Sequence, residues 1–221
     1  MKKALKLTLA SWNVRTLLDS TTSKSGSPER RTALVARELA RYRIDIAALS
    51  ETHFPDKGQL TEIGGGYTFF WSGCSSDERR EAGFGFAIKN DLVKKLVSIP
   101  EGLNDRLMKL KLPLGRKRSA TLISAYAPTM SNRDEFKEKF YEELEALISA
   151  VPQSDKLILL GDFNARVGQD HQVLDGIIGH HGVGKCNNNG LLLLRICATH
   201  GLVITNTMFR LPTRNKTSWM H

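Results

Sequence analysis

The apolar residues of this chain fall into short runs separated by polar and glycine-containing segments, and this pattern constrains the fold more than any other feature. Strand-like runs such as "IDIAALSET", "YTFFWSG" and "SATLISAYAP" are mixed irregularly with segments of helical periodicity. Because there is no strict β–α–β alternation, we expect mixed sheets rather than purely parallel ones, with helices covering their outer faces. No run approaches the length that spans a bilayer, so we expect a soluble protein without a membrane segment.

The N-terminal part predicts a strand, a helix and a second strand. "LKLTLASWNV" alternates apolar and polar residues and suits a half-buried strand that ends at Asn13. In "SGSPERRTALVARELARY", Ser27 is placed to cap a helix with Pro28 at its first position, and the helix should end near Tyr42. "IDIAALSET" follows as a buried strand with Glu51 at its end.

The later part predicts a β-meander, two helices and further strands. "FGFAIKN", "RLMKLKL" and "SATLISAYAP" are strand-like, and "PLGRKR" indicates a hairpin turn. Ser131 stands three residues before Asp134, which favours a capped amphipathic helix over 133–150. Its apolar face would contain Phe136, Phe140, Leu144 and Leu147. "NGLLLLRICATHG" predicts a short buried helix closed by Gly201, followed by the strands "LVITN" and "KTSWM".

Length, charge and cysteine content bound the class of protein. With 221 residues and no long Pro/Gly/Ser-rich linker, we expect residues 1–221 to form a single domain. Lys and Arg number 32 against 23 Asp and Glu, and this net charge of +9 favours a polyanionic partner such as nucleic acid or an anionic membrane face. Cys74, Cys186 and Cys197 form no close-spaced pair and predict free thiols in a reducing compartment.

The run "LILLGDFNARVG" is apolar enough for a buried strand, yet it ends abruptly in Gly161, Asp162 and Asn164. Gly-Asp-x-Asn is favourable turn chemistry, so an ordinary turn is the simpler interpretation. If the strand continued, Asp162 and Asn164 would lie on the same face, where a carboxylate and a carboxamide could act together.

Polar or ionisable residues end four of the strand-like runs: Asn13, Glu51, Tyr126, and the pair Asp162 and Asn164. Taken singly, each has an ordinary interpretation as a strand end, a surface carboxylate or a core aromatic. Taken together, two carboxylates could hold a Mg²⁺ ion that takes the rest of its shell from water and substrate phosphate, while amides and a phenol donate hydrogen bonds to phosphate oxygens. The set therefore predicts a site that cleaves phosphodiesters.

Several motifs resemble the endonuclease/exonuclease/phosphatase family: "WNV", "LSET", "SAYAP", "GDFNARVG" and "TSWMH" occur in its usual order. "NVRTL" and "GKCNNNGLLLLRICATHGLVITNT" resemble more narrowly the apurinic-type endonuclease domain of non-long-terminal-repeat retrotransposons and the derived craniofacial development protein 2 group. The resemblance implies a four-layer α/β/β/α sandwich of two mixed sheets with helices outside.

The resemblance also implies roles for individual residues. Glu51 matches the main metal ligand, Asp162 the residue that positions or deprotonates the attacking water and also contacts the metal, and Asn164 its partner on the scissile phosphate. Asn13 and Tyr126 would orient the metal shell and the phosphate. Ser218 and Trp219 of "TSWMH" match substrate-binding positions.

Two departures from the family pattern matter. Arg15 stands where the repair enzymes carry an acidic residue, which favours the retroelement branch. The family closes with an Asp-containing strand and an Asp-His pair, and neither follows "TSWMH" before the sequence ends at His221. We therefore expect a domain that is incomplete at its C-terminus, weakly stable and inactive in this form.

Two other motifs have simpler interpretations. "GHHGVGKC" (179–186) matches a phosphate loop up to Lys185, but Cys186 replaces the required Ser or Thr and no convincing strand precedes it, so an ordinary glycine-rich loop is favoured. The residues His171, His180, His181 and Cys186 match no common zinc spacing.

The leading hypothesis is a Mg²⁺-dependent DNA endonuclease of retrotransposon type, with Mn²⁺ as an alternative cofactor. The alternatives are a non-catalytic DNA-binding or scaffold remnant, and a phosphatase or phospholipase of the same family. We expect a monomer that binds DNA and no membrane, accompanied by a reverse transcriptase domain in a full-length protein. The location would be intracellular, nuclear if the substrate is genomic DNA, with the cytoplasm as the alternative.

Overall fold

The computed structural model describes residues 6–19, 30–73, 83–115, 118–170, 172 and 174–212. The chain divides into two compact units, of which the first contains residues up to Tyr126 together with Val151–Asp162, and the second contains Ala127–Ala150 and the residues from Phe163 onward. The expectation of a single domain stays a prediction.

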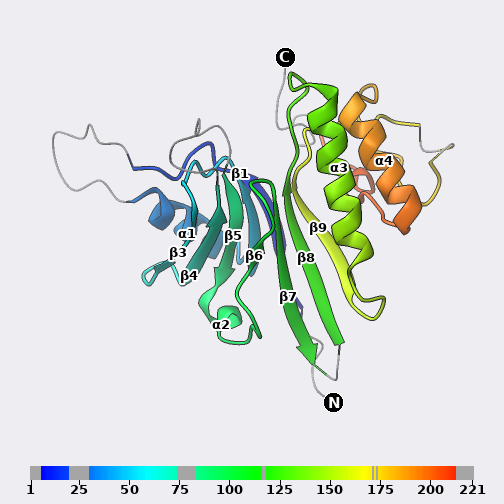
Figure 1. Cartoon of the computed structure of the whole chain (residues 1–221). Helices are drawn as coiled ribbons and strands as arrows, with labels where there is room; N and C mark the ends of the chain where they lie inside the picture. The colour runs from blue at the N-terminus through cyan, green and yellow to red at the C-terminus, as the bar shows by residue number, and fades with distance from the viewer. Residues whose placement is uncertain are drawn as a thin grey trace. The chain divides into compact units, whose positions relative to one another are not determined.

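The first unit contains two sheets (Figure 1). One has the order β1-β2-β5-β4-β3, with bounds β1 (Leu9–Asn13), β2 (Ile46–Ser50), β3 (Lys57–Glu62), β4 (Tyr67–Ser72) and β5 (Phe84–Lys89). The other has the order β6-β7-β8-β9, with bounds β6 (Glu101–Gly102), β7 (Leu107–Gly115), β8 (Arg118–Tyr126) and β9 (Lys156–Asp162). In each sheet one edge pair is parallel, β1 with β2 and β8 with β9, and the other pairs are antiparallel. The prediction of mixed sheets is confirmed.

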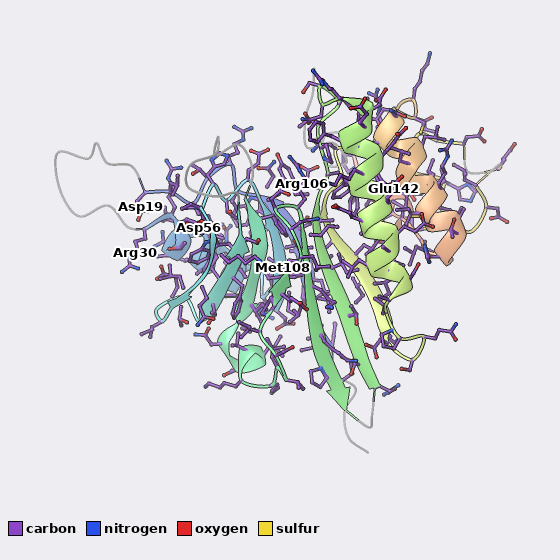
Figure 2. All side chains as sticks on the ribbon, in the orientation of Figure 1. Asp19, Arg30, Asp56, Arg106, Met108 and Glu142 are labelled. Atoms are coloured by element: carbon purple, nitrogen blue, oxygen red, sulfur yellow. The ribbon has the colours of Figure 1, made fainter. Side chains whose placement is uncertain are left out.

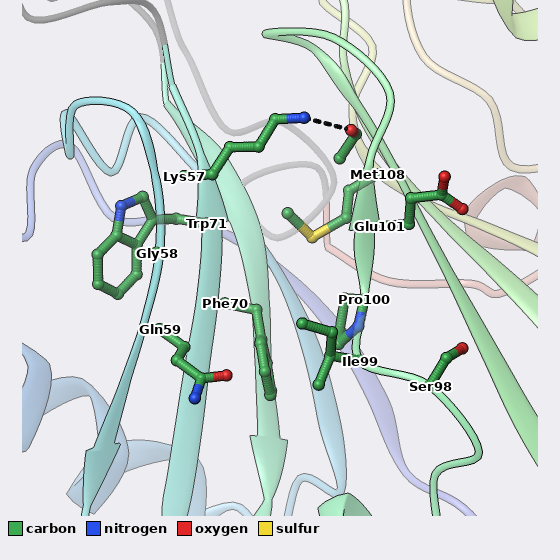
Figure 3. Close-up of a pocket in the computed structure, with 11 residues that line it drawn as sticks. Lys57, Gly58, Gln59, Phe70, Trp71, Ser98, Ile99, Pro100, Glu101 and Met108 are labelled. Carbon is green, nitrogen blue, oxygen red and sulfur yellow. Dashed lines mark hydrogen bonds between the residues drawn. The ribbon is translucent and has the colours of Figure 1, made fainter.

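The two sheets face each other across an apolar core. Phe84 and Phe86 of one sheet share a buried cluster with Met108, Leu110 and Leu122 of the other. Figure 2 marks Met108 in this layer, and Figure 3 shows Met108 in close-up together with Phe70, which belongs to the same cluster. Inward side chains of both sheets thereby lose their contact with water, which is the main stabilising term for such a sandwich.

The outer face of the first sheet is covered by helix α1 (Arg31–Arg41). Val35, Ala36 and Leu39 lie on one face of this helix and pack with Tyr67 and Phe69 of β4. Ser27 and Pro28, the predicted helix start, lie outside the described residues. A second short helix, α2 (Asn90–Val93), follows β5.

The second unit contains α3 (Asp134–Ser149), α4 (Asn188–His200) and the short 3₁₀ helix η1 (Thr205–Thr207). The predicted helix over 133–150 is confirmed, but its cap is not, because Arg133 occupies the capping position and the Ser131 hydroxyl contacts that of Thr129 instead. Phe136 was also placed wrongly on the buried face, since it is 59% exposed.

The end of α4 follows the sequence signals and the segment after it does not. Gly201 closes the helix in a left-handed conformation with φ of 62°, as predicted. "LVITN" was predicted as a strand, but only Ile204 makes an isolated bridge, to Ile178, and η1 follows at once. The segment therefore forms one isolated bridge and not the continuous backbone pairing of a strand. The predicted strand "KTSWM" lies outside the described residues.

Candidate active site

The ends of the two parallel strand pairs define the candidate site. In the first sheet Asn13 pairs with Ser50, which places Glu51 just beyond the end of β2. In the second sheet Tyr126 pairs with Asp162. Parallel neighbours end at the same edge of a sheet, so each pair presents its polar residues together.

The side-chain amide of Asn13 joins the two sheets. Its Nδ2 donates to Glu51 Oε1 at 2.7 Å and to Asp162 Oδ2 at 3.4 Å. Its Oδ1 accepts the backbone N–H of Arg15 at 3.0 Å, and this turn fixes which way the amide faces. Two carboxylates from different sheets are thereby brought to one nitrogen, so three of the predicted site residues are in contact.

Tyr126 completes the cluster from the end of β8. Its hydroxyl donates to Glu51 Oε1 at 3.4 Å, and the side chain is buried. Burial, followed by the negative charges of Glu51 and Asp162, raises the pKa of Tyr126 to about 12. The phenol therefore stays protonated at neutral pH and can act as a hydrogen-bond donor.

Glu51 is held in an unusual backbone conformation. Its φ is 57°, in the left-handed region that residues with a Cβ rarely adopt. The backbone on either side is fixed, because Ser50 accepts a hydrogen bond from Val14 and Thr52 donates one to Gly83. This bend ends β2 and turns the carboxylate towards Asn13. The strain is therefore located at the candidate site.

The residues that could hold a metal ion are Glu51 and Asp162. Their oxygen atoms are the hard ligands that Mg²⁺ prefers, and a site with two carboxylates leaves room for water and phosphate in the shell. The hydroxyls of Ser50 and Thr52, next to Glu51 in the chain, are buried and have no partner among the described residues, and ordered water is a common partner for such groups. The donor chemistry fits a hydrated divalent cation.

Asn164 belongs to the second unit. The strand β9 ends at Asp162, so the condition under which Asp162 and Asn164 would lie on one face of the strand is not met. Asn164 has a left-handed φ of 45°, and its Nδ2 donates to the carbonyl of Ala127 at 2.9 Å. The Gly-Asp-x-Asn segment therefore leaves the strand with a left-handed residue at Asn164, and Asp162 within it still contacts Asn13.

The segment around Asn164 is held by buried Asn189 in the first turn of α4. Asn189 Nδ2 lies 2.8 Å from the carbonyl of Pro128 and 3.3 Å from those of Phe163 and Asn164. Tyr141 donates its hydroxyl to the carbonyl of Asn189, at 3.0 Å. Pro128 is buried, so water cannot easily replace a donor lost from its carbonyl.

Asn189→Ala should lower the free energy of unfolding by about 1–3 kcal/mol, since it leaves the carbonyl of buried Pro128 without this donor. Asn188→Ala is the matched control, because Asn188 is exposed in the same helical turn and its side chain donates to Asp134 at 3.2 Å. Urea unfolding of both variants measures the difference. Equal stabilities would show that the Asn189 contacts contribute nothing.

A pH titration tests the environment of Tyr126. In the folded protein its pKa is raised from 10.0 to about 12, so the folded state keeps a proton that the unfolded state loses. The contribution of Tyr126 is therefore fully present below pH 10 and is lost by about pH 12, at a cost of about 2–3 kcal/mol. Denaturant melts with chelator present should show a steeper alkaline loss of stability in the parent than in Tyr126→Phe. Parallel curves would contradict this.

The other candidate residues have different outcomes. Ser218, Trp219 and His171 lie outside the described residues. The "GHHGVGKC" segment follows turn residues rather than a strand, and the Lys185 carbonyl accepts a hydrogen bond from Arg166 Nε at 2.6 Å, as in an ordinary packed loop. Within the described ranges, no group of three or more His, Cys, Asp or Glu side chains is arranged to hold a metal ion.

The fold and the site define an α/β protein in which carboxylates, an amide and a phenol gather at the ends of two parallel strand pairs. Residues 10–218 match the Endonuclease/Exonuclease/phosphatase family, and the chain belongs to this family. In the described part of the chain, no helix is both long and apolar enough to cross a membrane.

Curated relatives include craniofacial development protein 2 of Bos taurus and of Tragulus javanicus. Each is 30% identical over 211 residues, which is 96% of this chain. The chain spans 33% of the length of the bovine protein and 34% of the other, about a third of each.

Similar solved structures have lower identity. D. rerio TDP2 complexed with single strand DNA product is 18% identical, with a TM-score of 0.46 over 76% of this chain and 63% of that one. The human Nocturnin catalytic domain with bound sulfate is 16% identical, with a TM-score of 0.45 over 74% of this chain and 67% of that one.

Sequence reasoning missed two residues that support the site, Arg106 and Asn189. Arg106 precedes the run "LMKLKL" and has the appearance of an ordinary basic residue before a strand. Asn189 stands within "NNNG", where helix capping is the obvious role, and Asn187 does cap α4 by accepting the N–H of Gly190 at 2.8 Å. The only sequence signal for Asn189 was that two further Asn residues, Asn188 and Asn189, follow the capping residue, although one is enough to cap the helix.

Proposed function

We propose that this chain is the catalytic part of a divalent-metal-dependent DNA endonuclease of retrotransposon type. The observation that carries the proposal is the contact of the Asn13 amide with both Glu51 and Asp162, with the Tyr126 hydroxyl on the same Glu51 oxygen. In this arrangement the carboxylates can coordinate a cation and accept a hydrogen bond from water, and the neutral phenol can donate a hydrogen bond to a phosphate oxygen.

Each residue has a distinct role in the proposed hydrolysis. Asp162 orients the attacking water and accepts its proton, while Glu51 provides the main cation ligand. Asn13 holds the two carboxylates close to each other. Tyr126 donates a hydrogen bond to a phosphate oxygen, and the family pattern implies that Asn164 is a second hydrogen-bond donor to the phosphate. A bound Mg²⁺ ion, or Mn²⁺ in its place, would supply charge stabilisation for the phosphate.

The charge of the chain supports DNA as the substrate. The net charge is +9, although α3 carries six acidic residues and only two lysines, so the basic excess lies outside this helix. Basic side chains bind duplex phosphates without reading sequence. We propose a monomer that acts in the nucleus if its substrate is genomic DNA, as part of a longer protein with a reverse transcriptase domain.

The test is plasmid nicking by a version of the chain completed with the family's closing Asp-containing strand and Asp-His pair, and this version is the parent in all nicking measurements below. Supercoiled plasmid should be converted to the open circle with Mg²⁺ and remain supercoiled with chelator, while phosphoinositides and small phosphomonoesters should be poor substrates. Binding without nicking would favour a non-catalytic DNA-binding role. Preference for small phosphoesters or lipid head groups would favour a phosphatase or phospholipase.

Binding to duplex DNA should weaken steeply with salt. Each phosphate that a Lys or Arg neutralises contributes a slope of about −0.9 to log K against log salt, so several contacts predict a loss of about 10³-fold between roughly 50 and 200 mM salt. Fluorescence anisotropy with two unrelated duplexes measures both the slope and the sequence preference. A flat response would argue for a small phosphoester instead.

A further inference from the structure

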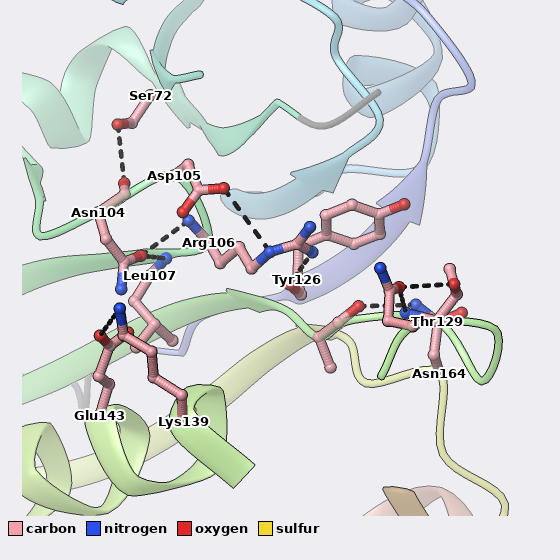
Figure 4. Close-up of polar contacts among 12 residues, drawn as sticks. Ser72, Asn104, Asp105, Arg106, Leu107, Tyr126, Thr129, Lys139, Glu143 and Asn164 are labelled. Atoms are coloured by element: carbon pink, nitrogen blue, oxygen red, sulfur yellow. Dashed lines mark hydrogen bonds and ion pairs between the residues drawn. The ribbon is translucent and has the colours of Figure 1, made fainter. Parts of the chain in front are cut away.

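Arg106 contacts Tyr126 in three ways (Figure 4). Its carbonyl accepts the backbone N–H of Tyr126 at 3.0 Å, and its Nη1 donates to the carbonyl of Tyr126 at 3.2 Å. Its guanidinium carbon also lies 5.5 Å from the centre of the Tyr126 ring, within the range of a cation–π contact. Both polar backbone groups of Tyr126 and its ring are therefore held by one residue.

The backbone of Arg106 is itself fixed by the preceding turn. Asn104 Oδ1 accepts the N–H groups of Arg106 and Leu107, at 2.8 and 2.7 Å. The carbonyl of Asn104 accepts the hydroxyl of buried Ser72, at the end of β4, at 3.0 Å. Figure 4 shows this chain of contacts running from Ser72 through Asn104 to Arg106. The turn links the first sheet to the tyrosine at the end of β8.

We infer that Arg106 is a positioning residue, which holds the ring of Tyr126 so that its hydroxyl reaches Glu51. The inference deepens the proposed function and rests on it, because the hydroxyl matters only if Glu51 and Tyr126 act on a substrate. The Arg106 side chain is 26% exposed and lies 3.7 Å from Asp105, which partly balances its charge. Arg106 therefore affects the reaction only by holding Tyr126 in place, without touching the substrate itself.

The shape of the guanidinium is as important as its charge. Its planar fork can donate to a carbonyl while its face lies against a ring, whereas a lysine ammonium is a compact point charge that cannot make both contacts in this geometry. Arg106→Lys therefore keeps the charge and loses the fork, and Arg106→Met loses both. The two variants separate the contributions of shape and charge.

The experiment compares kcat and KM for DNA nicking in Arg106→Lys and Arg106→Met. Both variants should lose about 10- to 100-fold in kcat with KM within about twofold of the parent, because a misplaced phenol affects the transition state more than binding. The loss should be larger for the methionine variant. A rise in KM at unchanged kcat would overturn the inference and make Arg106 a direct phosphate contact.

A matched control exists elsewhere in the first unit. Arg41 lies 5.3 Å over the ring of Tyr42, which is 64% exposed and precedes the start of β2, whereas Glu51 follows the end of that strand. Arg41→Lys and Arg41→Met should leave kcat unchanged. Thermal unfolding of all four variants identifies any that are simply misfolded.

A second measurement does not depend on activity. In protein with ¹³C-labelled tyrosine, the ring signal of Tyr126, assigned with Tyr126→Phe, should shift or broaden in both Arg106 variants and stay unchanged in the Arg41 variants. An unchanged Tyr126 signal would overturn the inference even if the parent cleaves DNA. If the parent does not cleave DNA but the signal still changes, the proposed function fails while the contact between Arg106 and Tyr126 stands.

Discussion

Asp162→Asn should reduce Mg²⁺-dependent plasmid nicking by about 10³-fold or more, since removing one member of a catalytic unit commonly costs several powers of ten. The substitution keeps the size of the side chain and removes its negative charge, so it can neither accept a proton from water nor neutralise a cation. Glu51→Gln should have an effect of the same order, because its Oε1 is the atom at which Asn13 and Tyr126 meet.

Single-turnover nicking rates measure these losses, and thermal unfolding shows whether the variants remain folded. Asp91→Asn is the matched control, because the Asp91 side chain is 82% exposed on the short helix α2. Nicking at the parental rate by Asp162→Asn would remove Asp162 from the mechanism.

Lys185→Ala should also keep nearly full activity. A large loss of activity together with nucleotide binding would revive the phosphate-loop interpretation.

Gly161→Ala should destabilise the fold by about 3 kcal/mol or more. A Cβ at this position would lie 1.9 Å from the carbonyl oxygen of Ala125, and the backbone φ is +139°, which side chains rarely adopt. Gly161 pairs with Ala125 in the parallel β8–β9 ladder, one residue before Tyr126 pairs with Asp162. A clash here separates the two strands at the point where they present the site.

Chemical denaturation measures the loss for Gly161→Ala, and nicking should fall with it. Gly64→Ala is the control, since a Cβ there meets no atom within 4 Å and the backbone is not left-handed. A Gly161→Ala variant as stable as Gly64→Ala would mean that β9 can shift at little cost. The close approach of these strands would then not be what fixes Asp162.

Several features of the site were predictable from sequence because they depend on local periodicity. One alternating run and two continuous apolar runs place strand ends at Asn13, Glu51 and Tyr126 to within a residue, and the glycine before Asp162 marks where β9 ends. The mixed character of the sheets also follows from the irregular order of strand and helix patterns. The weak edge strands β3 and β6 were missed, because their exposed residues leave little apolar alternation.

The sequence by itself determined which chemical groups stand at the ends of which strands, and the family to which the chain belongs. Only the tertiary structure decided that Asn13 bridges carboxylates from two sheets, that Arg106 lies against Tyr126, and that Asn189 holds the turn after β9. These contacts join residues far apart in the chain, so no local pattern records them. They depend on strand order and on the close approach of backbones, which are set when the two sheets pack and each unit buries its core.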